Sequence, residues 1–267
     1  MEKNAVYIGE KWLPYQEAER CFTVHSVFSR VVNVSTECGL LSIASSDIGG
    51  SSSFLSLPGV NIDLDTIPGE KCDLCNGRLY LGKNTINFIN APVWKGPISK
   101  GYRSNIKEEN IAAFKAVLDR KVAQQSSWKH INSAIESRYN GLGAIQKIRE
   151  NPSIIQNLIG LGMGLTPAGD DMVLGFLAIV NHTCENREFI GILHSIIADL
   201  LPKTTDISAQ ALENALNYDY HEIIQNCIRD LCECNKEEVY ISAASLMNIG
   251  ATSGTDIACG MYYGMIQ

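Results

Sequence analysis

The chain has 267 residues, of which 45% are hydrophobic, and its 29 acidic and 22 basic residues leave a formal net charge of −7. This acidic balance disfavours nucleic acid and anionic membrane surfaces as partners, because both need a basic face. No run of about 18 apolar residues predicts a membrane span, and the amino terminus lacks the apolar stretch of a signal peptide. We therefore expect a cytoplasmic protein.

The first hundred residues have the composition of short strands separated by turns. Residues 21–35 are rich in β-branched and aromatic side chains, and residues 39–45 form a short apolar run. Residues 78–82 and 84–90 alternate between apolar and polar side chains around a turn. The sequence therefore predicts an α+β protein, in which an antiparallel β barrel or sandwich occupies residues 1–103.

From about residue 104 onward, apolar side chains recur at helical spacing. The predicted helices lie around residues 111–122, 128–139, 190–200, 207–217, 219–233 and 237–248, and Asn151-Pro152 opens a further short helix. Residues 104–267 are therefore expected to form an all-helical domain.

The most informative stretch is Gly-Leu-Gly-Met-Gly-Leu-Thr-Pro-Ala-Gly-Asp-Asp at residues 160–171. Thr166 and Pro167 have the order that a helix start favours, with the hydroxyl residue as N-cap and proline as the first helical residue. Asp170 and Asp171 then fall in the first turn. A well-capped turn explains the threonine and proline but neither three alternating glycines nor two adjacent acids. The pattern favours a site where free backbone N–H groups bind a small anion, or where the acids bind a metal.

A second stretch, at residues 250–260, repeats this design. Gly254, Asp256 and Gly260 have the Gly-x-Asp-x-x-x-Gly spacing of residues 169–175, and Thr or Ser precedes the motif in both cases. The alternative is chance within the residue types common to turns. Two acidic helix starts in one domain favour a shared site, with the two helices beginning near Pro167 and Thr255.

A third hydroxyl-rich helix start lies at residues 202–208. Thr205 is its predicted N-cap, with the Ser208 N–H as the hydrogen-bond donor. Capping explains most of this pattern, and a functional reading requires the segment to lie near the glycine-aspartate loops.

These motifs define the candidate site. The catalytic candidates are Asp170, Asp171 and Asp256. The ligand-binding candidates are Gly162, Gly164, Thr166, Gly169, Thr205, Thr252, Ser253 and Gly254. The sequence requires no cofactor, but Asp171 and Asp256 are candidate oxygen ligands for a divalent cation such as magnesium.

Cysteine and histidine residues give weaker signals. Cys72 and Cys75 form a C-x-x-C pair, and Cys232 and Cys234 form a C-x-C pair, but a zinc site would need two halves of the chain to converge. We therefore expect ordinary reduced thiols. His25 lies in a predicted strand, where a structural role is the commoner one.

The core at residues 160–171 resembles a bacterial family that typically shows Gly-Leu-Thr-Pro-Ser-Gly-Asp-Asp. Thr-Thr-Asp-Ile-Ser at residues 204–208, residues 250–256 and Val-His-Ser-Val-Phe at residues 24–28 also resemble that family. Here Ala168 replaces the usual serine, so a hydroxyl at that position is not needed or is supplied elsewhere. The family includes a small subunit of oxamate carbamoyltransferase. The genes of its best-understood members lie beside bacterial genes of purine and allantoin degradation.

The resemblance implies a carbamoyltransferase subunit that works with other kinds of subunit. That enzyme type interconverts oxalurate plus phosphate with oxamate plus carbamoyl phosphate. All four are small anions, which suit helix N-termini. Two alternatives stay open. The chain could be a non-catalytic metabolite-binding or scaffold subunit, because neither core motif contains Lys, Arg or His. It could also be a metal-dependent enzyme acting on a small carboxylic acid.

Overall fold

The computed structural model describes residues 2–99, 101–124 and 147–266. The chain forms two compact units, Met1–Pro97 and Ile98–Gln267. The predicted helix at residues 128–139 lies outside the described residues. None of the described helices combines the length and the apolar character needed to cross a bilayer.

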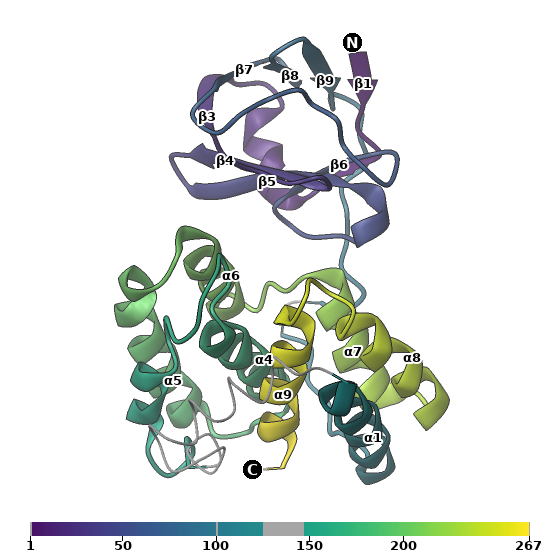
Figure 1. Ribbon diagram of the computed structural model, residues 1–267, viewed down its shortest axis with the longest axis vertical. Helices are drawn as coiled ribbons and strands as arrows, with labels where there is room; N and C mark the ends of the chain where they lie inside the picture. Colours follow the sequence, from purple (N-terminus) through teal and green to yellow (C-terminus); the bar gives the residue numbers. More distant parts are fainter. Residues whose placement is uncertain (1, 100, 125–146, 267) are drawn as a thin grey trace. The chain divides into compact units, whose positions relative to one another are not determined.

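The first unit is a nine-stranded sheet that curves around a short 3₁₀ helix, η1 (Glu10–Tyr15) (Figure 1). The strands are β1 (Glu2–Asn4), β2 (Tyr7–Ile8), β3 (Glu19–Val27), β4 (Val31–Thr36), β5 (Gly39–Ser45), β6 (Phe54–Leu57), β7 (Lys71–Cys75), β8 (Arg78–Leu81) and β9 (Asn84–Asn87), and a second 3₁₀ turn, η2, spans Ser46–Ile48. Their order across the sheet is β1-β9-β8-β7-β3-β4-β5-β6-β2.

Most neighbouring strands of this sheet are antiparallel, but β1 pairs with β9 and β5 with β6 in parallel. The predicted α+β class is therefore confirmed, with a half-barrel of mixed strand direction in place of a purely antiparallel barrel or sandwich. Alternating residues on the strands fill the core. Trp12 and Tyr15 of η1 pack edge-on against Phe22 within this core, where they exclude water.

In the second unit, the regular elements of the described residues are all helices (Figure 1). Its elements are α1 (Glu108–Gln124), η3 (Pro152–Asn157), α4 (Ala168–Thr183), α5 (Arg187–Leu200), η4 (Leu201–Lys203), α6 (Asp206–Leu216), α7 (Glu222–Glu233), α8 (Lys236–Leu246) and α9 (Ser253–Met265). Apart from the region that is not described, the helices predicted from apolar spacing are confirmed. Asn151 caps η3 by accepting a hydrogen bond from the Ser153 N–H.

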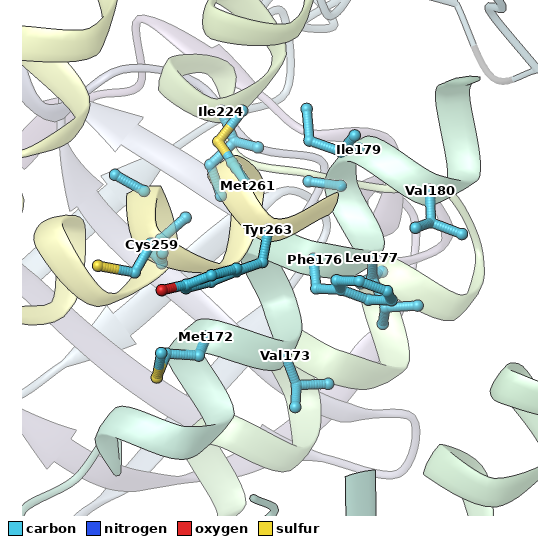
Figure 2. Close-up of a cluster of buried hydrophobic side chains, with 14 of the residues drawn as sticks. Met172, Val173, Phe176, Leu177, Ile179, Val180, Ile224, Cys259, Met261 and Tyr263 are labelled. Carbon is cyan, nitrogen blue, oxygen red and sulfur yellow. The ribbon is translucent and has the colours of Figure 1, made fainter. Parts of the chain in front are cut away.

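Helix α4 is the centre of this unit, because residues 172–180 are apolar on every side and nearly all of the helix is buried. It contacts α9 along most of its length, and it also contacts α6 and α7. Figure 2 shows the core between them, with Phe176 and Ile179 of α4 beside Met261 and Tyr263 of α9. This packing fixes where the amino ends of α4 and α9 lie.

Candidate functional site

The loop before α4 depends on three glycines with positive φ. The φ angles of Gly160, Gly162 and Gly164 are 77°, 131° and 93°. A side chain at Gly160 would also collide with the backbone, because its Cβ would lie 2.7 Å from the Lys203 carbonyl oxygen. Conformation and space therefore require glycine here whether or not a ligand binds.

The predicted cap of α4 is wrong by one residue. The helix begins at Ala168, and Pro167, with ψ of 138°, is the N-cap residue in place of Thr166. The Thr166 hydroxyl is therefore not used for capping. It lies 2.9 Å from the hydroxyl of Ser253, the first residue of α9. This hydrogen bond joins the two glycine-aspartate motifs directly, so the sequence prediction that they lie together is confirmed.

The third hydroxyl-rich segment reaches the same loop. The Thr205 hydroxyl donates a hydrogen bond of 2.5 Å to the Leu165 carbonyl. It also caps α6 by accepting from the Ser208 N–H at 3.2 Å, as predicted. The starts of α4, α6 and α9 thus converge on residues 160–167.

Asp170 holds the loop together. It is 2% exposed, and its two oxygens accept hydrogen bonds from the Gly160 N–H, at 2.7 Å, and from the Thr204 hydroxyl. Both partners belong to the protein, so we interpret Asp170 as an anchor between the loop and η4. Unlike Asp171, it is not carried into the proposed site.

Asp171 and Asp256 are both buried, at 6% and 0% exposure. The pKa of Asp171 is raised to about 8, chiefly by burial; hydrogen bonds with Ser253 and Thr166 oppose the rise, and the charges of Asp256 and Asp170 add to it. At neutral pH the Asp171 carboxyl is therefore mostly protonated. Its Oδ2 is buried and has no hydrogen-bond partner among the described residues.

The backbone donors differ from those predicted. The N–H groups of Gly169, Asp170 and Asp171 are all used inside the protein, by the carbonyls of Leu161 and Pro167. The available donors are those of the loop itself. Within the described part of the chain, no hydrogen bond uses the N–H groups of residues 162–165, and these residues are exposed. Successive N–H groups around glycines of positive φ can form an anion-binding nest.

The remaining motif glycines are explained by helix packing. An alanine Cβ at Gly169 would lie 2.0 Å from the Leu158 carbonyl oxygen, and one at Gly254 would lie 2.0 Å from that of Leu246. Both glycines are buried. Thr252 is the N-cap residue of α9 but makes no side-chain capping bond.

Comparison with known sequences adds one finding. A family model described as "Oxamate carbamoyltransferase subunit AllH" matches residues 158–265. The matched residues lie within the second unit. This match confirms the resemblance inferred from the motifs at residues 160–171, 204–208 and 250–256, and it includes the starts of α4, α6 and α9. No curated protein and no solved structure matches the chain significantly.

Two features of residues 158–265 could not be predicted from the sequence. Thr204 was expected only as part of a helix start, but its hydroxyl binds Asp170. Lys203 precedes it, is exposed, and contacts Gly160 through its carbonyl. The sequence signal for both was the hydroxyl-rich run at residues 202–208, whose proximity to the loop is a tertiary property.

The remaining candidates from the sequence are a metal site, the cysteines and His25. Among the described residues, no group of three or more His, Cys, Asp or Glu side chains could hold a metal ion. All nine cysteines are described, and none forms a disulfide. Burial raises the pKa of Cys72 to about 12, which keeps this residue a thiol. The His25 Nδ1 lies 3.1 Å from the Ser26 hydroxyl on β3.

Proposed function

We propose that residues 160–167, together with the starts of α4, α6 and α9, bind one small anionic ligand, and that the chain acts as a subunit of an oxamate carbamoyltransferase complex. The observation that carries the proposal is the hydrogen bond between Thr166 and Ser253, because it joins two motifs that are 87 residues apart. Anions are favoured at helix N-termini, and here three such ends lie together.

The backbone N–H groups of the loop and the Asp171 carboxyl suit a ligand that has both a carboxylate and a primary amide. The N–H groups of residues 162–165 would hold the carboxylate or a phosphate. A protonated Asp171 adds no negative charge, and it can donate through its hydroxyl or accept from an amide NH₂. Paired acids are therefore compatible with an anionic ligand at neutral pH.

In the reaction that the family description suggests, the carbamoyl group of oxalurate passes to phosphate. The bond between the carbamoyl carbon and the amide nitrogen breaks, and a bond from that carbon to a phosphate oxygen forms. The nitrogen takes up the proton that the attacking hydrogen phosphate gives up and leaves as the NH₂ group of oxamate. We propose that this chain orients the ligand for that step. We place the reaction in allantoin catabolism in the cytoplasm.

Residues 160–171 and 250–260 contain no Lys, Arg or His. A partner subunit would therefore supply the general base and most of the cationic stabilisation of the transition state. Lys203 is a cation of this chain whose backbone lies against the loop. A divalent cation at Asp171 and Asp256 stays a prediction, and the proposed ligand binding does not depend on it.

A second candidate is a non-catalytic subunit that binds a metabolite or holds its partners together. The contacts of Asp170, Gly169 and Gly254 favour it, since all of them are internal to the protein. The two candidates differ in whether altering the loop changes turnover or only assembly and ligand affinity.

The experiment is reconstitution of the complex from this chain and its partner subunits. Carbamoyl phosphate formed from oxalurate and phosphate is measured with wild-type chain, with Thr166→Val, and with Ser245→Ala as control. Ser245 is an exposed hydroxyl that bonds only within α8. We expect Thr166→Val to lower kcat/KM at least about tenfold, the effect of losing roughly 1.4 kcal/mol of transition-state binding. Unchanged turnover with a normal assembly would favour the non-catalytic candidate.

A further inference from the structure

The first unit contains an open hollow that the proposed function does not use. It encloses about 1040 Å³ and lies between the β3–β4 turn and the segment at residues 61–70. We call it the acidic hollow. Its lining residues are Val27, Phe28, Ser29, Val32, and all ten of residues 61–70.

The acidic hollow has an apolar floor and partly exposed apolar walls. Ile62 and Leu64 are almost fully buried beneath it. Phe28 is 39% exposed on one side and Ile67 is 69% exposed on the other. Exposed apolar side chains that gather around a concave surface are typical of binding surfaces, whereas isolated ones need no explanation.

The charged residues that line the hollow are all acidic. Asp63, Asp65 and Glu70 are among the lining residues, and none of the lining residues is Lys, Arg or His. Glu70 is occupied, because its carboxylate accepts from the Thr66 hydroxyl at 2.7 Å and from the Ile67 N–H at 3.3 Å. Asp65 has a contact of 4.0 Å with Lys83, and both side chains are largely exposed, so this ion pair is weak.

The shape of the hollow is fixed by the backbone. The segment at residues 61–70 has no regular secondary structure, yet the Ile62 N–H donates to the Ser29 carbonyl and the Gly69 N–H donates to the Val24 carbonyl. The Asn84 side chain donates to the Leu64 carbonyl at 2.7 Å. A surface that is formed in advance loses less entropy when it binds.

We propose that the acidic hollow docks an extended segment of another subunit of the complex, with an aliphatic side chain entering the hollow and flanking Lys or Arg side chains meeting Asp63 and Asp65. The volume is at the upper end of small-molecule pockets, roughly 300–1,000 Å³, and the hollow is open, which favours a polypeptide. The acids disfavour the small anions proposed for the helical unit. The inference rests on the proposed function in one respect, that the chain works with partner subunits.

The test measures binding of the purified partner subunits to the immobilised full chain. Asp63→Lys and Ile67→Ser should each weaken binding at least about tenfold, since both alter the hollow at its contact groups. Glu17→Lys and Val60→Ser are the matched controls, because both residues are exposed in the same unit outside the hollow. The controls should bind like the wild type.

The salt dependence of binding distinguishes the electrostatic contribution to partner affinity from the apolar contribution. The screening length falls from about 10 Å at 0.1 M salt to about 3 Å at 1 M, so the defect of Asp63→Lys should shrink at high salt while that of Ile67→Ser persists. Both altered residues are exposed, so thermal midpoints should match the wild type and show that folding is intact.

Two results would overturn the proposal in distinguishable ways. If the wild-type chain binds the partner subunits and both hollow variants bind equally well, the docking inference fails alone. If the wild-type chain binds no partner subunit, partner dependence fails and the docking inference fails with it.

Discussion

Gly175 on α4 lies so close to Ile257 on α9 that an alanine Cβ at position 175 would come within 1.9 Å of the Ile257 carbonyl oxygen. The relationship is reciprocal, since a Cβ at Gly260 of α9 would come within 1.9 Å of the Met172 carbonyl oxygen on α4. The repeated Gly-x-Asp-x-x-x-Gly spacing therefore sets two helices in direct backbone contact. It also places Asp171 and Asp256 at corresponding positions one residue before those carbonyls.

Gly175→Ala and Gly260→Ala should each destabilise the protein by about 3 kcal/mol or more, because a backbone carbonyl cannot move aside as a flexible side chain can. Chemical denaturation measures the loss. Gly191→Ala in α5 is the control, since its Cβ would meet nothing within 4 Å. There the helix propensity of alanine should stabilise by about 0.5–1 kcal/mol. Equal effects at the three positions would contradict the packing described here.

Asp171→Asn should remove a pH dependence of stability. The folded-state pKa of about 8 lies above the ordinary aspartate value of about 3.9, so the folded chain holds a proton that the unfolded chain releases. Stability should therefore fall as pH rises between about 4 and 8 and level off above 8, at up to about 1.4 kcal/mol per pH unit.

Thermal midpoints of wild type and Asp171→Asn, measured from pH 5 to pH 8.5, check this expectation. Asparagine does not titrate, so the variant should gain on the wild type as pH rises. Parallel curves across that range would show that Asp171 titrates normally.

Asp170 and Thr204 should behave as one structural unit. Asp170→Ala removes the partner of the Gly160 N–H and the Thr204 hydroxyl, and we expect it to cost roughly 1.5–3 kcal/mol, the range for hydrogen bonds to a charged group. Thr204→Val should cost less. The double variant, compared by denaturation, should lose less than the two single losses combined, since the hydrogen bond is removed only once. Additive losses would mean that the two side chains are independent.

Much of the fold could be predicted from the sequence because its signals are local. Apolar spacing located α5 to α8, and the Thr205 cap was predicted together with its partner. The parallel pairing of β1 with β9 could not be predicted, because it joins residues from opposite ends of the first unit and leaves no local pattern. The predicted start of α4 was one residue too early, because Pro167 has an extended ψ that residue type alone does not reveal.

The candidate site was located correctly but interpreted only in part. Glycine is required equally by a bound ligand and by a close backbone contact, so the sequence could not separate Gly162 from Gly169. A Cβ would meet backbone atoms at both positions, but the structure separates them by exposure and φ, since Gly169 is buried in a helix and Gly162 is exposed in the loop with a φ of 131°. Likewise, adjacent Asp170 and Asp171 look equivalent in sequence. Only the tertiary contacts with Thr204 and Ser253 assign them different roles.

The central claim is that the starts of α4 and α9 form one anion site, and a double-mutant cycle of oxamate binding tests it most directly. Titration calorimetry measures oxamate affinity of the full chain, Thr166→Val, Ser253→Ala and the double variant, with Ser245→Ala as control. We predict that each single change weakens binding about tenfold and that the double variant binds no more weakly than the weaker single variant, because the two hydroxyls share one hydrogen bond. Oxamate binding that is unaffected by all three changes, or losses that simply add, would contradict a shared site.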